Sequence, residues 1–404
     1  MNKFLVLVVF ISFFLNEASA FQNSSLEANN EKEEIYKPNI LSTHPFGLFF
    51  NRLQGNFKHK PSDKTQIYIH FNGGNIWGTP ITTYVPRDNQ IRDDVRQHVW
   101  HQAQYFFDEE MLDADSFYLE IDGVIKSLKI EGRLTINNHS EVTIGVRSFI
   151  LTNGKMPFSV LTSDDFIETF HEKIAGGDDP FDRGVFGLNK ASIKYTDRNG
   201  RTMTLNKNDF IFSGIETSYY RYIKKWTTDN FTPNYGIHIG TNLSEYNSSL
   251  DLGLSANAIK TYKLNEKSNI NIGLNIGVLR KGLIELKSNN LQFGNNNIIG
   301  SFEGTIQYSL TSNSHRIHAI GIDYYLQSSL NKRDELNYII PIRHPDAHKS
   351  WGHGVTNLYK TNNYWTLFYA FGKRVIKTLY LQQDLQVNNN PDIQTGISIS
   401  FNLN

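Results

Sequence analysis

His348 and Ser350 are the residues whose types and spacing could most directly support catalysis. They stand two apart, and Asn362 lies downstream. Residues two apart on a strand share a face, so the imidazole could act as a base on the hydroxyl, as in a lipid hydrolase or deacylase. Pro345 and Gly352 crowd this segment, however, and favour a polar loop over a strand. We therefore expect no catalytic residues, and a lipid hydrolase using His348 and Ser350 remains the alternative function.

The same stretch contains side chains that could bind a metal. His344, Asp346, His348 and His353 lie within ten residues of one another, but their spacings match no closed zinc pattern. The chain has no cysteine, so it has neither a thiolate metal site nor a thiol nucleophile. We expect no metal and no cofactor.

Charged side chains in the middle of apolar, alternating segments indicate a different chemistry. A buried sheet face does not tolerate such charges, whereas the wall of a water-filled lumen does. The leading interpretation is therefore a pore or passive transport barrel for small solutes, not an enzyme. The charges could instead pair with one another and close the lumen, leaving a structural barrel. The positions expected to face the lumen are Lys129, Glu131, Arg133, Arg147, Asp251 and Glu303.

The elements that carry these charges alternate with a period of two, which is typical of strands. From Ile393 to Leu403 one face is mostly aliphatic and the other is small and polar, and 270–278 repeats the pattern. A soluble β-sandwich also alternates. Several of these strands reach about ten residues, and their inner faces carry charge and glycine, which favours a barrel. The expected fold is all-β, an antiparallel transmembrane outer-membrane β-barrel.

The connections alternate between short polar turns and long loops. Barrels of this kind keep short turns on the periplasmic side and long loops outside. Counting back from the last strand predicts about 14 strands beginning near Thr65, with both ends periplasmic. Segment 46–57 is an uncertain extra strand, so 12 or 16 strands are also possible.

Two of the long loops have helical patterns, at 92–112 and 163–174. In the second, Ser163 can cap the helix, and the apolar stripe consists of Phe166, Phe170 and Ile174. We expect short helices in extracellular loops. Because an apolar stripe must be covered, we expect 163–174 to fold against the barrel and to narrow its extracellular opening.

The first twenty residues resemble a secretory signal peptide. Lys3 precedes an apolar run over 4–15, and Ala18-Ser19-Ala20 forms a small-x-small cleavage site. The run is too short to cross a bilayer comfortably, which takes about 20 residues. The expected organisation is a signal peptide at 1–20, a flexible periplasmic lead-in at 21–45 and a transmembrane barrel at 46–404.

The composition agrees with an exported barrel. Formal net charge is +0, which gives no reason to expect nucleic acid as a partner. Mean hydropathy is −0.41, and alternate lipid-facing residues are compatible with this value whereas membrane helices are not. The expected location is the bacterial outer membrane. The expected partners are its lipids and the assembly machinery that reads the C-terminal strand.

Three separated motifs lie between roughly 120 and 404. They are Asp122-Gly123 before the strand 127–134, the run Asp165-Phe166-Ile167-Glu168-Thr169-Phe170-His171, and Gln383-Asp384-Leu385 with Asn390-Pro391-Asp392 and the closing strand. Together they resemble the uncharacterised bacterial outer-membrane family catalogued as domain of unknown function 3187.

The resemblance implies a barrel and an outer-membrane address, and it implies no activity. Gln383 departs from the acidic residue expected at that position. The second motif places Asp165, Glu168 and His171 on the loop helix. We expect His171 to dock the helix by hydrogen bonds, not to perform chemistry.

Overall fold

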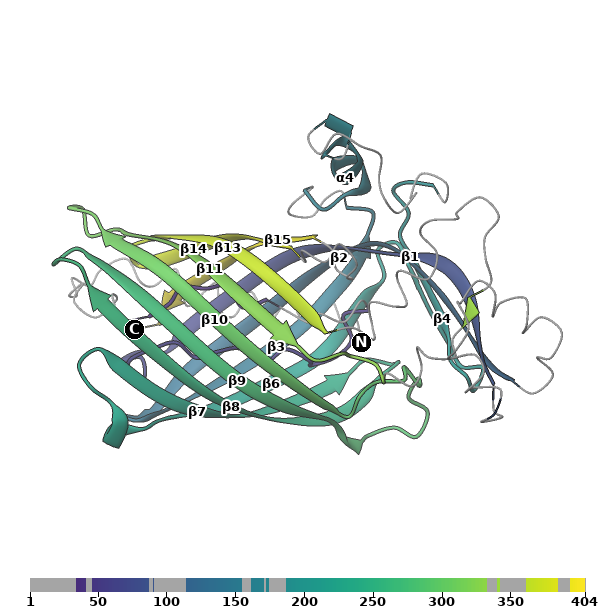
Figure 1. The fold of residues 1–404 in the computed structure, drawn as a ribbon, viewed down its shortest axis with the longest axis horizontal. Coiled ribbons are helices and arrows are strands. Elements are labelled where there is room, and N and C mark those ends of the chain that lie inside the picture. The colour runs from purple at the N-terminus through teal and green to yellow at the C-terminus, as the bar shows by residue number, and fades with distance from the viewer. Residues whose placement is uncertain are drawn as a thin grey trace.

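A closed antiparallel barrel of twelve strands is the main body of the computed structural model (Figure 1). The structure describes residues 34–40, 46–86, 90, 114–154, 161–170, 172–173, 187–332, 340–341, 361–383 and 393–403. The barrel closes because β1 pairs with both β2 and β15, with Ile69 opposite Ile130 on one side and Ile399 on the other. In the order around the wall, the strands are β1 (Gln66–Pro86), β2 (Ala114–Asn137), β3 (Ser140–Thr152), β6 (Phe210–Tyr222), β7 (Phe231–Leu243), β8 (Ser248–Lys263), β9 (Ser268–Glu285), β10 (Ile298–Thr311), β11 (Ile317–Gln327), β13 (Asn362–Gly372), β14 (Val375–Gln383) and β15 (Ile393–Asn402).

The period of two in the sequence separates the inside of the barrel from the outside. On β9, Asn271 and Asn275 are 0% exposed, whereas Leu274 is 50% and Ile276 is 64% exposed. Successive side chains of a strand point to opposite faces, so the outer face is apolar and the inner face polar. This confirms the facing predicted from the sequence. No helix among the described residues is long and apolar enough to cross a membrane.

The expectation of about 14 strands roughly fits the total, because twelve strands, one of the alternative counts, form the wall and a two-stranded hairpin lies outside it. The first strand begins at Gln66, next to the expected start at Thr65. The hairpin of β4 (Ser192–Thr196) and β5 (Thr202–Asn206) lies outside the barrel, as does the two-residue strand β12 (Ile340–Pro341). Alternation reveals a strand but not the sheet edge with which it pairs, so the sequence could not separate this hairpin from the wall.

Strands β1 and β2 extend beyond the barrel into a small external sheet (Figure 1). From Val124 onward β2 pairs with β3, whereas Tyr118–Asp122 pairs with β4. Gly123 lies at this change of partner with φ +149°, and a Cβ there would lie 3.0 Å from Leu151 Cδ1. Glycine suits this position because other residues rarely adopt this conformation and a Cβ would crowd Leu151 and the Thr152 carbonyl.

Of the helix expected at 163–174, the structure describes α4 (Asp164–Phe170) and two further helical residues at 172–173, and α4 projects away from the barrel (Figure 1). Asp164 accepts hydrogen bonds from Asn75 Nδ2 at 3.1 Å and from the Asn189 amide at 2.7 Å. Ile167 is the buried apolar residue, and Phe170 is 41% exposed. The expected stripe through Phe170 is therefore not the covered face, and the described helix does not narrow the opening.

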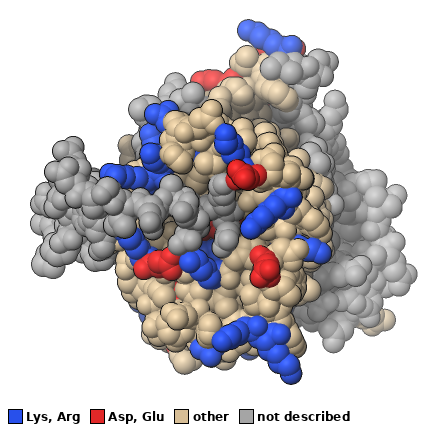
Figure 2. All heavy atoms as spheres, turned by 90° about the vertical axis from the view of Figure 1, so that its left-hand side faces the viewer, with Lys and Arg blue, Asp and Glu red and all other residues tan. Residues whose placement is uncertain are grey.

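The two ends of the barrel differ. The short turns gather at one end, where Leu403 N–H donates to Thr65 O at 2.7 Å and so joins the two ends of the wall. Figure 2 shows this end, on which blue Lys and Arg side chains outnumber the red acidic ones. The β9–β10 loop (286–297), α4 and the external sheet lie at the opposite end, here called the long-loop end (Figure 1). Exposed cations of the short-turn end include Lys224, Lys225, Lys263, Lys267, Arg316 and Lys373.

Candidate functional site

The lumen is occupied by the chain's own N-terminal part, residues 34–40 and 46–59, here called the inner segment (purple inside the barrel in Figure 1). Two passes lie side by side, because Glu34 pairs with Lys58 as an antiparallel bridge and Ile35 N–H donates to Phe57 O at 3.1 Å. This corrects two expectations. The described part of the lead-in, 34–40, lies inside the barrel, and 46–57 is not a wall strand.

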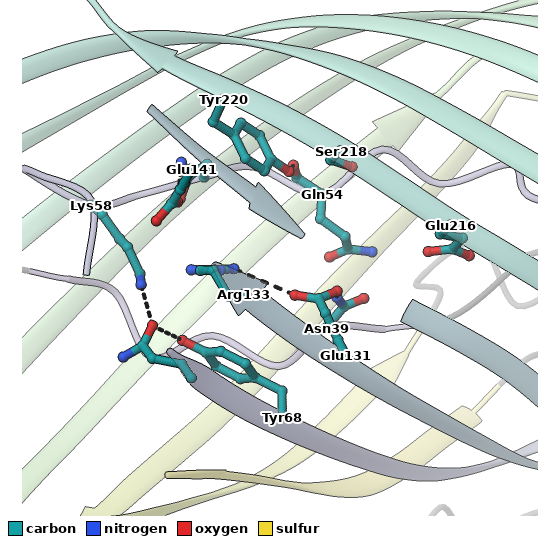
Figure 3. Close-up of polar contacts among 12 residues, drawn as sticks. Asn39, Gln54, Lys58, Tyr68, Glu131, Arg133, Glu141, Glu216, Ser218 and Tyr220 are labelled. Atoms are coloured by element: carbon teal, nitrogen blue, oxygen red, sulfur yellow. Dashed lines mark hydrogen bonds and ion pairs between the residues drawn. The ribbon is translucent and has the colours of Figure 1, made fainter. Parts of the chain in front are cut away.

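A charged network from β2, β3 and β6 lies at the inner wall. Lys129 Nζ lies 2.7 Å from Glu216 and 3.1 Å from Glu131, and Arg147 Nε lies 3.1 Å from Glu216. Arg133 contacts Glu131 at 3.6 Å, and Figure 3 shows this pair. A charge enclosed in protein is tolerated only when it is paired and hydrogen-bonded, and here each cation faces a carboxylate.

The inner segment continues this network. Asn39 Nδ2 donates to Glu131 at 3.1 Å, and Lys37 Nζ lies 2.5 Å from Glu303. The second oxygen of Glu303, a residue that is 0% exposed, accepts from Gly55 N–H at 2.7 Å. The wall carboxylate is therefore satisfied by both passes of the inner segment.

Asp251 completes the set of six positions that we expected to face the lumen. Its carboxylate accepts from Asn242 Nδ2 at 2.7 Å and from Gly282 N–H at 2.7 Å. The structure places all six side chains on the inner side of the wall. It brings four of them into one network and joins Asp251 to it through Asn242, which accepts from Arg147 and donates to Asp251. Glu303 instead binds Lys37 and Gly55 of the inner segment.

Further polar contacts hold the second pass. Arg52 donates to Gln382 at 2.8 Å, lies 3.7 Å from Asp323, and stacks 4.0 Å from the Tyr325 ring centroid. Lys58 Nζ donates to Gln66 at 2.6 Å, next to Tyr68 in Figure 3. Cations of the inner segment thus meet wall acceptors along the length of the lumen.

At the long-loop end the inner segment contributes to an aromatic cluster, defined as Phe46, Phe49, Tyr195 and Phe293. Phe293 lies in the β9–β10 loop, with ring centroids 5.4 Å from Phe46, 5.2 Å from Phe49 and 5.1 Å from Tyr195. Burial raises the pKa of Tyr195, with a further contribution from Asp197, so its hydroxyl stays neutral and donates to Gln292 O at 2.6 Å. The cluster packs the inner segment against the β9–β10 loop and the external hairpin through apolar contacts.

A small cavity remains between the inner segment and the wall, near the short-turn end. Its volume is about 70 Å³, enough for a few water molecules. The lining is polar and charged, which suits water that bridges the groups. Its lining includes Glu34, Lys37, Lys58, Tyr68, His70 and Arg133.

Other residues singled out in the sequence contribute little here. On α4, Asp165 accepts from Asn189 Nδ2 at 2.7 Å, and Glu168 is half-buried. His171, His348 and Ser350 lie outside the described residues, as do the segments 1–33 and 92–112. Within the described ranges, no three His, Asp or Glu side chains gather as a metal site would require.

Sequence reasoning missed the inner segment, although two signals pointed to it. Segment 46–57 is rich in apolar residues that do not alternate, which is unlike a wall strand. The inner faces of β7, β8 and β9 carry glycines in mid-strand, which leave room beside the wall. The unalternating apolar residues are Phe46, Leu48, Phe49, Phe50, Leu53 and Phe57.

Comparison with known proteins gives likenesses of fold only. No family model and no curated protein sequence matches the chain, and the resemblance to domain of unknown function 3187 stays a prediction. Similar solved structures include an outer-membrane channel from Pseudomonas putida F1, at 8% identity and TM-score 0.34, covering 84% of this chain and 96% of that chain. LpxR from Salmonella typhimurium has 8% identity and TM-score 0.37, covering 83% and 99%. A Pseudomonas aeruginosa FadL homologue has 7% identity and TM-score 0.32, covering 85% and 91%. None of these likenesses assigns a role to a residue of this chain.

Proposed function

We propose that this chain is a bacterial outer-membrane β-barrel that passes small solutes through its lumen when the inner segment moves. Support for the membrane comes from the outer face, where a wide apolar surface has no protein cover among the described residues. Such a surface is stable in hydrocarbon and not in water. Its exposed members include Leu254, Leu274, Ile276, Ile306, Ile322 and Leu367.

The observation that carries the transport proposal is the way the lumen is filled. In a purely structural barrel, side chains of the wall itself fill the interior. Here the wall presents glycines and polar side chains, and two passes of non-wall chain occupy the space. Moving the inner segment out would leave a polar passage at least as wide as those two extended chains.

Substituted-cysteine labelling combined with single-channel recording tests this proposal. The sequence has no cysteine, so an introduced thiol is the one that reacts. Leu53→Cys places a thiol on the inner segment at a site that is 2% exposed. A bulky water-soluble maleimide can react only when the segment leaves its seat, and the adduct then prevents its return. We expect slow labelling of refolded full-length protein, followed by a lasting rise in conductance.

Leu264→Cys is the matched control, since Leu264 is 55% exposed in the β8–β9 turn. It should label at once and leave the current unchanged. Complete labelling of Leu53→Cys with no ion current would show that the barrel is structural and that the transport proposal is wrong.

A further inference from the structure

The wall contacts the backbone of the inner segment as well as its side chains. Gln307 accepts from Tyr36 N–H at 2.7 Å and donates through Nε2 to Glu34 O at 3.1 Å. Thr378 donates to Tyr36 O at 3.1 Å, and Asn271 Nδ2 donates to Glu34 O at 3.2 Å. One wall amide thus bonds to residues two apart along an extended chain, as a neighbouring strand would.

The second pass is held in the same way. Asn257 Oδ1 accepts from Asn56 N–H at 3.2 Å, and Asn234 Nδ2 donates to Asn56 O at 2.9 Å. Asn242 Oδ1 accepts from Phe50 N–H at 2.9 Å. Contacts to N–H and C=O groups are available to any peptide in an extended conformation, so they recognise polypeptide as a class and not one sequence.

Side-chain preference comes from glycines in the wall. A Cβ at Gly240 would lie 2.1 Å from the Phe50 ring, and one at Gly273 would lie 2.7 Å from the Phe57 ring. A Cβ at Gly253 or at Gly277 would lie 2.8 Å from Leu53. Each of the three apolar side chains therefore sits in a socket of bare backbone. Phe50, Leu53 and Phe57 are 4%, 2% and 3% exposed.

We propose that the lumen is a binding site for an extended polypeptide with apolar side chains at the spacing of residues 50, 53 and 57, and that the inner segment is its intramolecular ligand. This rests on the proposed function, since a second peptide reaches the site only when the inner segment leaves it. The transported or captured solute would then be a peptide.

Competition in the full-length protein tests the proposal. An attached ligand acts at a high effective concentration, so it must first be weakened. The double variant Leu53→Ala and Phe57→Ala empties two sockets and leaves the wall intact. The probe is a labelled synthetic peptide of residues 46–60, and its binding is followed by fluorescence anisotropy in detergent. A control peptide has the same composition with the residues at 53 and 54, and those at 57 and 58, exchanged.

We expect the native peptide to bind the variant roughly tenfold or more tightly than the exchanged peptide, because two buried apolar side chains are worth at least that factor. Equal binding of the two peptides would overturn the proposal, as would equal competition by an uncharged oligosaccharide. Anisotropy requires no ion current, so this result is independent of the conductance test of the transport proposal.

A second pair of changes covers the case in which the double variant does not fold. Gly273→Leu fills the socket of Phe57 from the wall side in an otherwise native chain. A peptide carrying Phe57→Ala should bind this variant more tightly than the native peptide, because the leucine occupies the space of the Phe57 ring. Equal or tighter binding of the native peptide would show that Gly273 is no socket and that the proposal fails.

Discussion

Different chemistry holds the inner segment toward the two ends of the lumen. At the long-loop end the aromatic cluster, which includes Phe49 and Phe293, excludes water by packing rings together. Toward the short-turn end, polar contacts beside a cavity hold the inner segment to the wall, where Lys37 pairs with Glu303 and Lys58 donates to Gln66. Water can replace a polar contact at little loss, whereas it cannot replace apolar packing. We infer that the inner segment begins to leave from the short-turn end and that the aromatic cluster holds it longest.

The largest expected effect comes from breaking the aromatic end. Phe293→Ala removes the ring that contacts three others, and large-to-small changes of this kind cost about 3–5 kcal/mol where the site cannot collapse. We expect faster hydrogen exchange over residues 46–53 and frequent channel openings. Leu286→Ala is the control, because Leu286 is 50% exposed at the start of the same loop. Equal effects of the two changes would mean that the cluster does not hold the segment.

The next effect comes from the polar end. Lys37→Met leaves Glu303 as a buried carboxylate without its cation, and breaking such a pair costs about 3–4 kcal/mol. Unfolding in phospholipid vesicles should show this loss, and hydrogen exchange should rise over residues 34–40 before it rises over 46–53. The double change Lys37→Met with Glu303→Gln should recover most of the stability, since no charge is then left unpaired. If exchange rises first over 46–53, the order of release is the opposite of the one inferred.

The wall was predictable from the sequence because it follows a local rule. A strand between lipid and a polar interior must alternate, so Leu274 and Asn275 reveal their faces without knowledge of any neighbour. The inward position of Glu303 followed for the same reason. The partners of such charges did not follow, since Lys37 lies 266 residues from Glu303 in the chain.

The inner segment was not predictable in this way because nothing local requires it. Its backbone bonds to side chains such as Gln307 and not to a strand ladder, so it has no period. Phe57 and Gly273 lie far apart in the sequence and come into contact only inside the barrel. Neither residue, taken with its sequence neighbours alone, indicates that the other lies beside it. The available signals were the apolar residues of 46–57 that do not alternate and the glycines in mid-strand.

A third test asks whether the outer face of the barrel lies in lipid. Leu274→Arg should cost roughly 2–4 kcal/mol if that outward position lies near the middle of the membrane. Val375→Arg is the control, because Val375 is also outward but lies at the short-turn rim beside Lys373, where the cost falls to about 0–1 kcal/mol. Equal costs, measured by unfolding in vesicles, would argue against a membrane around this face.

From the sequence alone, Asn275→Arg would be the control for Leu274→Arg, because Asn275 faces inward. In the structure the inner segment fills the lumen, so an arginine at this position is not harmless. Asn275 is 0% exposed, and its Nδ2 donates to Glu303 at 3.4 Å. An arginine there would have to displace the inner segment. We therefore expect Asn275→Arg to open the channel, whereas Leu274→Arg should not.

The smallest effect should come from an ion pair that lies outside the lumen. Lys60 and Asp63 approach to 3.1 Å, with side chains that are 45% and 60% exposed. Such surface pairs contribute about 0–1 kcal/mol, because water screens the charges and the side chains lose freedom in pairing. Lys60→Ala should therefore change the free energy of unfolding by no more than about 0.5 kcal/mol. Hydrogen exchange over residues 34–40 and channel conductance should stay as in the wild type. Lys37→Met removes a cation of the same type from the same N-terminal part, so the difference between the two variants measures what enclosure in the lumen adds. A loss at Lys60 as large as that at Lys37 would mean that the short-turn end is held by general charge attraction and not by seated ion pairs.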